Sequence, residues 1–368
     1  MTQQRFIDEI KISGFKSIKE LTLPLGKLNV FIGANGAGKS NFIGVFSLLN
    51  HIAEHRLQNY VSKRGASSLL YYGRKTTTEI KVALSYADKT TGYKFTLAPN
   101  DQDSLFFSDE RCLYHNKVKY PKPFDGCLGT NHQETKLDTP LDCCINVAPY
   151  VLSDLKNWKL YHFHDTSENS PMKQTTPIAD NRSLKYNANN LAAFLYFLKH
   201  HQKSSYTEIV KTVQLAAPFF LDFLVEPVPE NPNNVRLEWW DTKSDAYFNS
   251  NMLSDGTLRF ICLTTLLLQP QLPSVIVLDE PELGLHPAAI ALLAEMIKSA
   301  SQKSQVVIST QSITLINHFA PEEIIVAERK ADTGESLFKR LEKKDIEQWL
   351  EEYALGVIWE KNIIGGRP

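Results

Sequence analysis

The sequence predicts an α/β protein whose core elements lie at both ends of the chain, with a long insertion between them. Three observations carry this prediction. A glycine-rich segment at 33–40 follows an apolar strand and opens a helix, and a second apolar strand ends in two carboxylates at 279–280. The region between them alternates first at period two and then at helical spacing. We therefore expect a P-loop core, an antiparallel β region and an inserted helical lobe.

Composition narrows the class of protein further. The 368 residues hold 40 basic and 41 acidic side chains, so no overall positive field favours nucleic acid, although a local patch remains open. The five cysteines show no paired metal-ligand spacing, which suits a reducing cytoplasm. The first ten residues are too charged for a signal peptide, and the longest apolar run, 260–268, is about half of a membrane span. We expect a soluble, cytoplasmic protein without a membrane partner.

The first half of the chain reads mainly as strands. Alternation over 6–32 predicts strands with a turn at Gly14, and a helix is predicted from Gly38 to about Glu54. Period-two alternation predicts an antiparallel region over roughly 76–120, ending in the strand 109–120. The signal over 121–150 is weak.

The second half alternates between helical and extended patterns. A strand is predicted to end within 157–167, a polar linker runs to about 186, and 188–224 reads as helical. A hairpin is predicted over 235–251, followed by a helix from about 256, a strand at 274–279, a helix from Pro287 to about Ser299 and a strand at 305–310. We divide the chain into a first ATPase half at 1–165, a helical lobe with its hairpin at 166–255, and a closing part at 256–368.

The segment FIGANGAGKSN, residues 31–41, fits the phosphate-binding pattern G-x-x-x-x-G-K-[ST] in its required strand-to-helix context. Its glycines allow successive N–H groups to converge on phosphate oxygens, and the helix N-terminus favours negative charge. Lys39 is predicted to reach the β and γ phosphates of ATP, and Ser40 to offer a hydroxyl to Mg²⁺. The predicted nucleotide contacts in this segment are Asn35, Gly36, Ala37, Gly38, Lys39, Ser40 and Asn41.

The segment SVIVLDEPELGLHP, residues 274–287, places two carboxylates at the tip of a buried strand. Asp279 is predicted to hold the Mg²⁺, and Glu280 to polarise the attacking water as general base. Taken alone, such a pair is usually an acidic strand end in solvent. The P-loop upstream favours the catalytic interpretation.

The strand 305–310 ends in Ser309-Thr310-Gln311-Ser312. A polar side chain at the tip of a neighbouring core strand can sense the γ-phosphate, and Gln311 is the candidate. The alternative is that one of the hydroxyl residues simply caps the following helix.

The segment LSDGTLRF, residues 253–260, opens an apolar helix with a Ser-Asp-Gly step. If two copies face each other, Ser254 and Gly256 would close over the γ-phosphate held by the partner's P-loop, and the helix dipole would favour that charge. ATP would then join a homodimer. The alternative is an ordinary serine N-cap with an aspartate in the first turn.

Taken together, these motifs resemble the ABC-type ATPase head of the RecF, SMC and OLD-like group. The N-terminal run IKISGFKSIKELTLPLGKLNVFIGANGAGKSN and the segment LDEPELGLHP carry the resemblance. It implies that Lys16, the basic residue of the Phe-Lys-Ser step, lies near the nucleotide phosphates. The sensor position, commonly histidine in ABC heads, is Gln311 here, and the glutamine that usually joins the two lobes is not identifiable; 162–165 is its expected region.

Two members of the resemblance group carry large parts that this sequence lacks. OLD nucleases continue into a TOPRIM domain of about a hundred residues, whereas 50 residues follow His318 here, and 343–353 reads as an amphipathic helix. SMC proteins place long heptad arms between P-loop and signature, whereas the 213 residues between Ser40 and Ser254 hold no sustained heptads. We therefore expect a stand-alone head.

The resemblance implies an ATPase that dimerises around ATP and controls a separately encoded effector, often of TOPRIM type in this group, in bacterial anti-phage defence. The first alternative is a RecF-like repair or loading ATPase that clamps DNA, with basic clusters at 63–65, 73–75 and 116–122 as its support. A transporter subunit and a non-hydrolysing ATP switch are the remaining alternatives.

Overall fold

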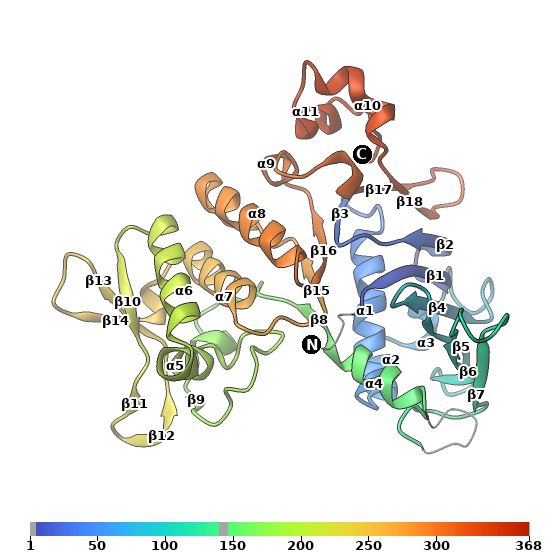
Figure 1. Ribbon diagram of the computed structural model, residues 1–368, viewed down its shortest axis with the longest axis horizontal. Helices are drawn as coiled ribbons and strands as arrows, with labels where there is room; N and C mark the ends of the chain where they lie inside the picture. The colour runs from blue at the N-terminus through green and yellow to red at the C-terminus, as the bar shows by residue number, and fades with distance from the viewer. Residues whose placement is uncertain (1–4, 140–145, 368) are drawn as a thin grey trace.

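The computed structural model describes residues 5–139 and 146–367, so the adjacent Cys143 and Cys144 lie outside the described residues. A central sheet stands in the middle of the molecule (Figure 1). One of its faces is covered by helix α1 (Lys39–Ala53) and a large antiparallel sheet, and the other by the helical lobe. The predicted α/β class with both additions is confirmed.

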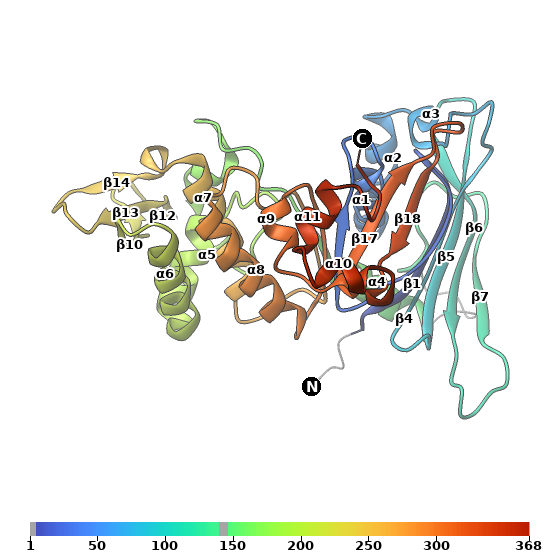
Figure 2. The ribbon, with the colours of Figure 1, turned by 90° about the horizontal axis from the view of Figure 1, so that it is seen from above.

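The antiparallel sheet has the order β2-β1-β4-β5-β6-β7 and forms one side of the molecule (Figure 2). Its strands are β1 (Ile7–Phe15), β2 (Ile18–Pro24), β4 (Ile80–Tyr86), β5 (Thr91–Pro99), β6 (Leu105–Tyr114) and β7 (Phe124–Gly129).

Two details of this region differ from the prediction. The first turn lies at Lys16, which adopts a left-handed φ of 51°, and Gly14 sits inside β1, where a Cβ would come within 2.3 Å of the Glu79 carbonyl oxygen. The strand predicted to run to residue 120 ends at Tyr114. Beyond it, the Asn116 side chain accepts from the Val118 and Lys119 N–H groups, which forms a turn instead of a ladder.

The central sheet has the order β18-β17-β3-β16-β15-β8, and only β18 pairs antiparallel. Its strands are β3 (Leu28–Ile32), β8 (Trp158–Tyr161), β15 (Val275–Asp279), β16 (Gln305–Thr310), β17 (Ile324–Arg329) and β18 (Ser336–Arg340). Because parallel strands end at one edge, the segments that follow β3, β15 and β16 meet there.

Two hydrophobic cores share this sheet as a common wall. Leu28, Val30 and Ile32 of β3 face the core of the helical lobe, whereas Phe31 faces α1. The rings of Phe31 and Phe42 stack at 4.3 Å between centroids. Burial on both faces explains why β3 reads as a continuous apolar run instead of an alternating one.

The inserted lobe contains α5 (Leu191–His201) and α6 (Lys203–Ala216), preceded by a 3-10 turn at Pro171–Lys173. The prediction of helix to residue 224 is wrong at its end, because Phe220–Leu224 forms strand β10. Pro218 interrupts the helix, and Phe220 and Phe223 are buried against the neighbouring strand. The predicted hairpin is present as β13 (Glu238–Asp241) and β14 (Tyr247–Asn249).

A second small sheet completes the lobe, with β9 (Thr176–Pro177), β11 (Pro227–Val228) and β12 (Asn231–Val235). After a 3-10 turn at Ser250–Met252, helices α7 (Asp255–Leu268) and α8 (Pro287–Ser301) begin as the sequence predicts.

The remaining helices are short. They are α2 (Leu57–Ser62), α3 (Ala66–Leu69), α4 (Ala148–Asn157), α9 (Ile313–Ile316), the 3-10 turn Pro321–Glu323, α10 (Lys343–Leu350) and α11 (Leu355–Glu360). Helix α10 lies within the segment predicted as amphipathic. Across 5–139 and 146–367, no helix combines the length and apolar character that crossing a bilayer requires.

Candidate nucleotide-binding site

Helix α1 presents an open N-terminus at the edge of the central sheet. Its N-cap is Gly38, at φ 113°, and no side chain caps the helix. Within the described residues, the N–H groups of Gly38, Lys39 and Ser40 donate to no acceptor. A Cβ at position 38 would lie 2.1 Å from Ser336 Oγ, so only glycine fits there. Unpaired N–H groups at a helix N-terminus form a site for an anion such as phosphate.

Lys39 is 4% exposed and folds back over this loop. Its Nζ donates to the Gly33 carbonyl at 2.6 Å and to the Ala34 carbonyl at 3.1 Å. Burial lowers the pKa of Lys39, and the nearby carboxylates of Glu280 and Asp279 partly oppose that shift. The ammonium group is therefore held by weak partners that a phosphate could replace.

Asp279 ends β15, directly beside Ser309 of β16, and the Ser309 hydroxyl donates to Asp279 Oδ1. The Ser40 side chain is exposed at the first turn of α1. A carboxylate and a hydroxyl are both hard oxygen donors, the chemistry that Mg²⁺ prefers while it keeps several waters. The residues present therefore fit a phosphate-bound Mg²⁺, although the described residues hold no cluster of three or more His, Cys, Asp or Glu side chains for a metal.

Glu280, Gln311 and Asn35 form one hydrogen-bonded group. Gln311 Nε2 donates to Asn35 Oδ1 at 2.9 Å and to Glu280 Oε1 at 2.5 Å. Glu280 adopts a left-handed φ of 44°, and its N–H donates to the Ser309 carbonyl at 2.9 Å. Such a conformation is uncommon for a residue with a Cβ and is found at functional sites. The structure thus joins a predicted base, a predicted sensor and the P-loop.

Glu282 is a site residue that the sequence reasoning missed. It is buried, it accepts from Thr310 Oγ1 at 2.5 Å, and burial raises its pKa. Its position in the strand-to-helix segment after Asp279 was the available signal. The contact ties this segment to the tip of β16.

Lys16 lines a cavity of about 410 Å³ beside α1. Burial, with a smaller contribution from Arg64, lowers the pKa of Lys16. The cavity is lined by Lys16, Ser17, Asn41, Ser67, Ser68, Leu70, Tyr72, Gly73 and Arg329. Lys16 and Asn41 are thus placed together, beside the start of α1.

A chain of polar contacts anchors this cavity. Asn41 Nδ2 donates to Ser17 Oγ at 2.6 Å, and Ser17 Oγ lies 2.6 Å from Ser336 Oγ. Ser17 belongs to the Phe-Lys-Ser step that the sequence had singled out. Ser336 lies 319 positions further along the chain, and no local sequence pattern marks it as part of this site.

Ser254 and Gly256 lie apart from this group. Ser254 is exposed and caps α7, accepting from the Thr257 N–H at 3.2 Å, as the N-cap alternative predicts. A Cβ on Gly256 would lie 2.3 Å from the Gly284 carbonyl oxygen. Within the described residues, no hydrogen bond joins either residue to the P-loop.

Arg259, one turn into α7, holds three segments together. Its guanidinium donates to the carbonyls of Phe163 at 3.0 Å and His164 at 3.1 Å, and also to that of Leu283. The side chain is 6% exposed, and its three acceptors are all backbone carbonyls. Helix α7 is thereby fastened to the segment after β8 and to the segment after Asp279.

His162 follows the end of β8, whose partner strand β15 ends at Asp279. Burial lowers the pKa of His162, and the Asp279 carboxylate opposes that shift. The region 162–165, expected to join the lobes, thus adjoins the predicted metal-binding carboxylate, with histidine in first position.

Comparison with known proteins places this chain in a family. The family model AAA_21, described as "AAA domain, putative AbiEii toxin, Type IV TA system", matches residues 28–317. A comparison with curated proteins gave no match.

Two Smc heads are among the solved structures that share the fold. One is an Smc head bound to the C-terminal winged-helix domain of ScpA, with a TM-score of 0.57 and 19% identity over 92% of this chain and 99% of that chain. The other is an Smc head with an extended coiled coil, bound to the C-terminal domain of ScpA from Pyrococcus furiosus, with a TM-score of 0.56 and 16% identity over 95% and 99%. The chain belongs to the AAA_21 family, and its fold is that of an ABC-type ATPase head of the RecF/SMC group.

Proposed function

We propose that this protein binds ATP with Mg²⁺ and hydrolyses it between two copies of the chain. One observation carries the proposal. Lys39, Asp279, Glu280 and Gln311 surround the open N-terminus of α1, whereas Ser254 lies exposed at a separate helix start of the same chain. A second copy would bring residues 254–256 to the phosphates that the first copy holds.

The residues divide the chemistry between them. The N–H groups at 38–40 would hold the phosphates, and Lys39 would exchange its two carbonyl partners for the β and γ oxygens. Ser40 and Asp279 would hold the Mg²⁺, which neutralises charge on those oxygens. Lys16 and Asn41 would face the nucleotide from the neighbouring cavity.

Glu280 would take the proton of the attacking water while its oxygen bonds to the γ-phosphorus and the bond to the departing ADP oxygen breaks. Gln311 would hold the Glu280 carboxylate in place through the 2.5 Å hydrogen bond, and its second hydrogen bond, to Asn35, would connect it to the P-loop. This assigns Gln311 a positioning role, which is consistent with an amide that does not titrate.

Mixing two inactive variants tests the shared site. Lys39→Ala removes the P-loop cation, and Ser254→Arg blocks the other half of the predicted site. A mixed dimer has one intact site, built from the Lys39 of one copy and the Ser254 of the other. We expect the mixture to regain up to about half of wild-type phosphate release per chain, because neither variant can pair with itself around ATP and each mixed dimer carries one intact site of two. No recovery, with both variants folded, would overturn the two-copy site.

We further propose that the ATP cycle controls a separate effector, in the setting of bacterial defence. The family description names a type IV toxin–antitoxin system, and the Smc heads with this fold carry ScpA domains. The lobe also exposes Leu215, Phe219 and Leu221. A native pull-down of Glu280→Gln protein with ATP tests this: a stoichiometric protein partner supports it, and nuclease-sensitive DNA as the sole companion contradicts it.

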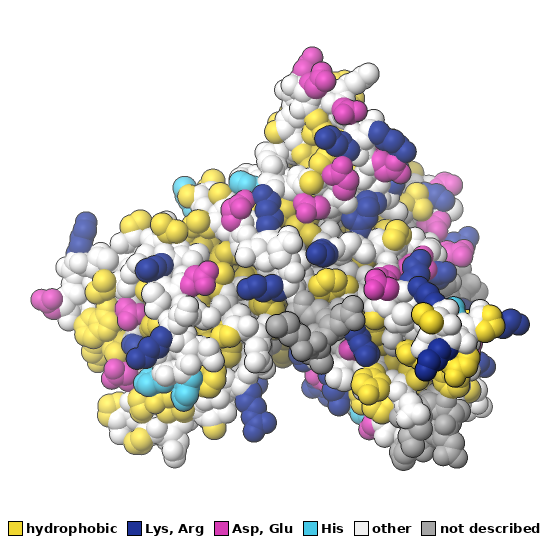
Figure 3. Space-filling view, viewed as in Figure 1, with side chains coloured by type: hydrophobic (Ala, Val, Ile, Leu, Met, Phe, Trp, Pro, Cys, Tyr) yellow, Lys and Arg dark blue, Asp and Glu magenta, His cyan; other side chains and the backbone are white. Residues whose placement is uncertain are grey.

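The second candidate is a DNA clamp. The loop between β6 and β7 exposes Val118 and Tyr120 beside Lys119 and Lys122, which form no ion pair within the described residues. Against it, lysines of the antiparallel sheet are neutralised, as in Lys81–Glu79 at 2.5 Å, and the face in Figure 3 mixes both signs of charge. DNA binding that weakens steeply with salt would support the clamp.

A further inference from the structure

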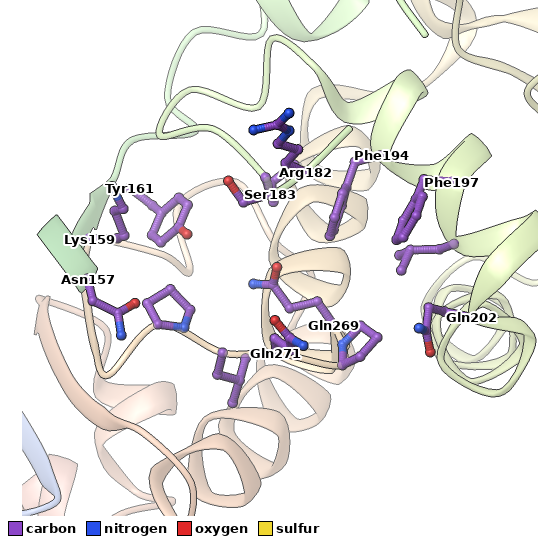
Figure 4. Close-up of a pocket in the computed structure, with 15 residues that line it drawn as sticks. Asn157, Lys159, Tyr161, Arg182, Ser183, Phe194, Phe197, Gln202, Gln269 and Gln271 are labelled. Atoms are coloured by element: carbon purple, nitrogen blue, oxygen red, sulfur yellow. The ribbon is translucent and has the colours of Figure 1, made fainter. Parts of the chain in front are cut away.

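A cavity of about 410 Å³ lies between the edge strand of the central sheet and the helical lobe (Figure 4). Lys159 and Tyr161 come from β8 on one side, and Phe194 and Phe197 from α5 on the other. Gln269, just after α7, lies between them. The volume falls in the range of small-molecule sites, and none of its lining residues belongs to the proposed ATP site.

The Tyr161 hydroxyl offers a hydrogen-bonding group to this cavity. The residue is 3% exposed, and within the described residues its hydroxyl has no hydrogen-bond partner. In Figure 4 the oxygen is turned toward the cavity, away from β8. The hydroxyl opens onto the cavity, so a ligand bound there can form a hydrogen bond with it.

The charged side chains of the cavity wall favour a ligand that carries a negative charge. Lys159 is half-buried, and burial lowers its pKa. Arg182 lies at the rim on the loop before α5, and within the described residues neither cation forms an ion pair. No lining residue is acidic. Two cations without a counter-charge favour an anion.

The rest of the wall suits a flat ring. Phe194 and Phe197 offer neighbouring aromatic surfaces on which a planar group can stack. Gln269 is 7% exposed, and its Nε2 donates to the Leu266 carbonyl at 2.8 Å, which fixes the amide. Its Oε1 accepts no hydrogen bond within the described residues, so it can accept one from a donor at the edge of a bound ring.

We propose that this cavity binds a small organic anion with a planar ring, of the chemistry and size of a nucleoside monophosphate. Lys159 and Tyr161 hold the anionic group, α5 stacks the ring, and Gln269 contacts its edge. Because the walls come from both the sheet and the lobe, the bound ligand fixes the lobe against the sheet. This site is independent of the proposed ATP site.

Calorimetric titration of AMP, GMP, CMP and UMP into the Lys39→Ala protein tests the proposal without a working P-loop. We expect saturable binding of at least one nucleotide, with one site per chain and equal affinity in the wild type. Tyr161→Phe and Lys159→Gln should each weaken it about tenfold, the effect of one charge-assisted or buried hydrogen bond. Lys156→Gln, at an exposed position on α4 outside the cavity, is the matched control and should change nothing.

Three outcomes overturn the proposal. They are the absence of saturable binding for all four nucleotides, binding that disappears in Lys39→Ala, and binding that the Tyr161→Phe/Lys159→Gln double variant retains in full. Thermal unfolding of each variant identifies protein that is misfolded. Tyr161→Phe keeps the buried ring and removes only the hydroxyl, so it remains informative where Lys159→Gln lowers stability.

Discussion

At the scale of single residues, Glu280 combines a strained backbone with a fixed carboxylate. Its left-handed φ is maintained by its N–H bond to the Ser309 carbonyl, and its side chain by Gln311. A carboxylate held in this way needs little rearrangement before it meets a water. In the proposed mechanism two tasks are separate, with Gln311 orienting the carboxylate and Glu280 accepting the proton.

Glu280→Gln removes the proton acceptor and keeps the shape of the side chain. We expect the rate of ATP hydrolysis to fall about 10²–10⁴-fold, the usual contribution of a general base, with little change in ATP affinity. Phosphate release and ATP binding measure the two effects. Glu295→Gln, on the exposed surface of α8, is the control; a Glu280→Gln protein that matches its turnover would remove Glu280 from the mechanism.

The lowered pKa of Lys39 predicts a pH dependence of ATP binding. The ammonium form binds phosphate, so affinity is greatest below the pKa of the nucleotide-free chain and falls as the pH rises through it. ATP dissociation constants of Glu280→Gln protein, measured between about pH 7 and pH 10, should therefore increase. Lys39→Arg keeps its proton over that range and should flatten the curve. An equal slope in both proteins would assign the effect to another group.

At the scale of elements, the sequence predicted best those elements that are buried and bounded by a recognisable motif. Strands β3, β15 and β16 and helices α1 and α8 were predictable because each has a continuous or periodic apolar pattern bounded by a motif. Residues 220–224 were misread as helix because Phe220 and Phe223 fit a helical spacing as well as a strand. Only the pairing with β13 decides between them.

The same limit applies to the candidate site. Lys39, Asp279 and Glu280 stand in two motifs that each follow a buried strand, and such motifs meet at one edge of a parallel sheet, so their proximity could be predicted. The contact of Ser17 with Ser336 and that of Glu282 with Thr310 join distant segments through side chains. No local pattern encodes such contacts, because they depend on which strands become neighbours.

Arg259 allows a test of how α7 is fastened. Arg259→Met keeps much of the buried volume and leaves the carbonyls of Phe163, His164 and Leu283 without this donor. At about 1–3 kcal/mol for each buried group left unpaired, and with partial relaxation, we expect the free energy of unfolding to drop by about 2–4 kcal/mol. Denaturant unfolding measures it. A loss below 0.5 kcal/mol, typical of surface positions, would show that the contacts are dispensable.

At the scale of the whole molecule, the two lobes lie on opposite faces of one sheet, and the edge where β3, β15 and β16 end remains accessible. Ser40 and Ser254 are both exposed. In the proposed pair, Ser40 of one copy and Ser254 of the other come from different parts of the molecule, so each proposed site would belong to two chains.

The mass of the particle in solution tests that arrangement. We expect Glu280→Gln protein to change from the 41.7 kDa of one chain to about twice that mass when ATP and Mg²⁺ are added. Light scattering coupled to size exclusion measures the change. Ser254→Arg should prevent it, while Ser204→Arg, at an exposed position in α6, should not. A mass that stays at that of one chain in all three proteins would contradict the proposed dimer.

The three carbonyl partners of Arg259 have a consequence for how the molecule moves. A joint built from carboxylates loosens when acid protonates them or salt screens them, whereas backbone carbonyls carry no titratable group and a guanidinium keeps its charge throughout the physiological range. The joint between α7 and the two segments beside the proposed metal site should therefore keep the same stiffness across cellular conditions. A displacement of those segments would be passed on to α7, so the lobe should respond to changes around the phosphates more than to fluctuations in acidity.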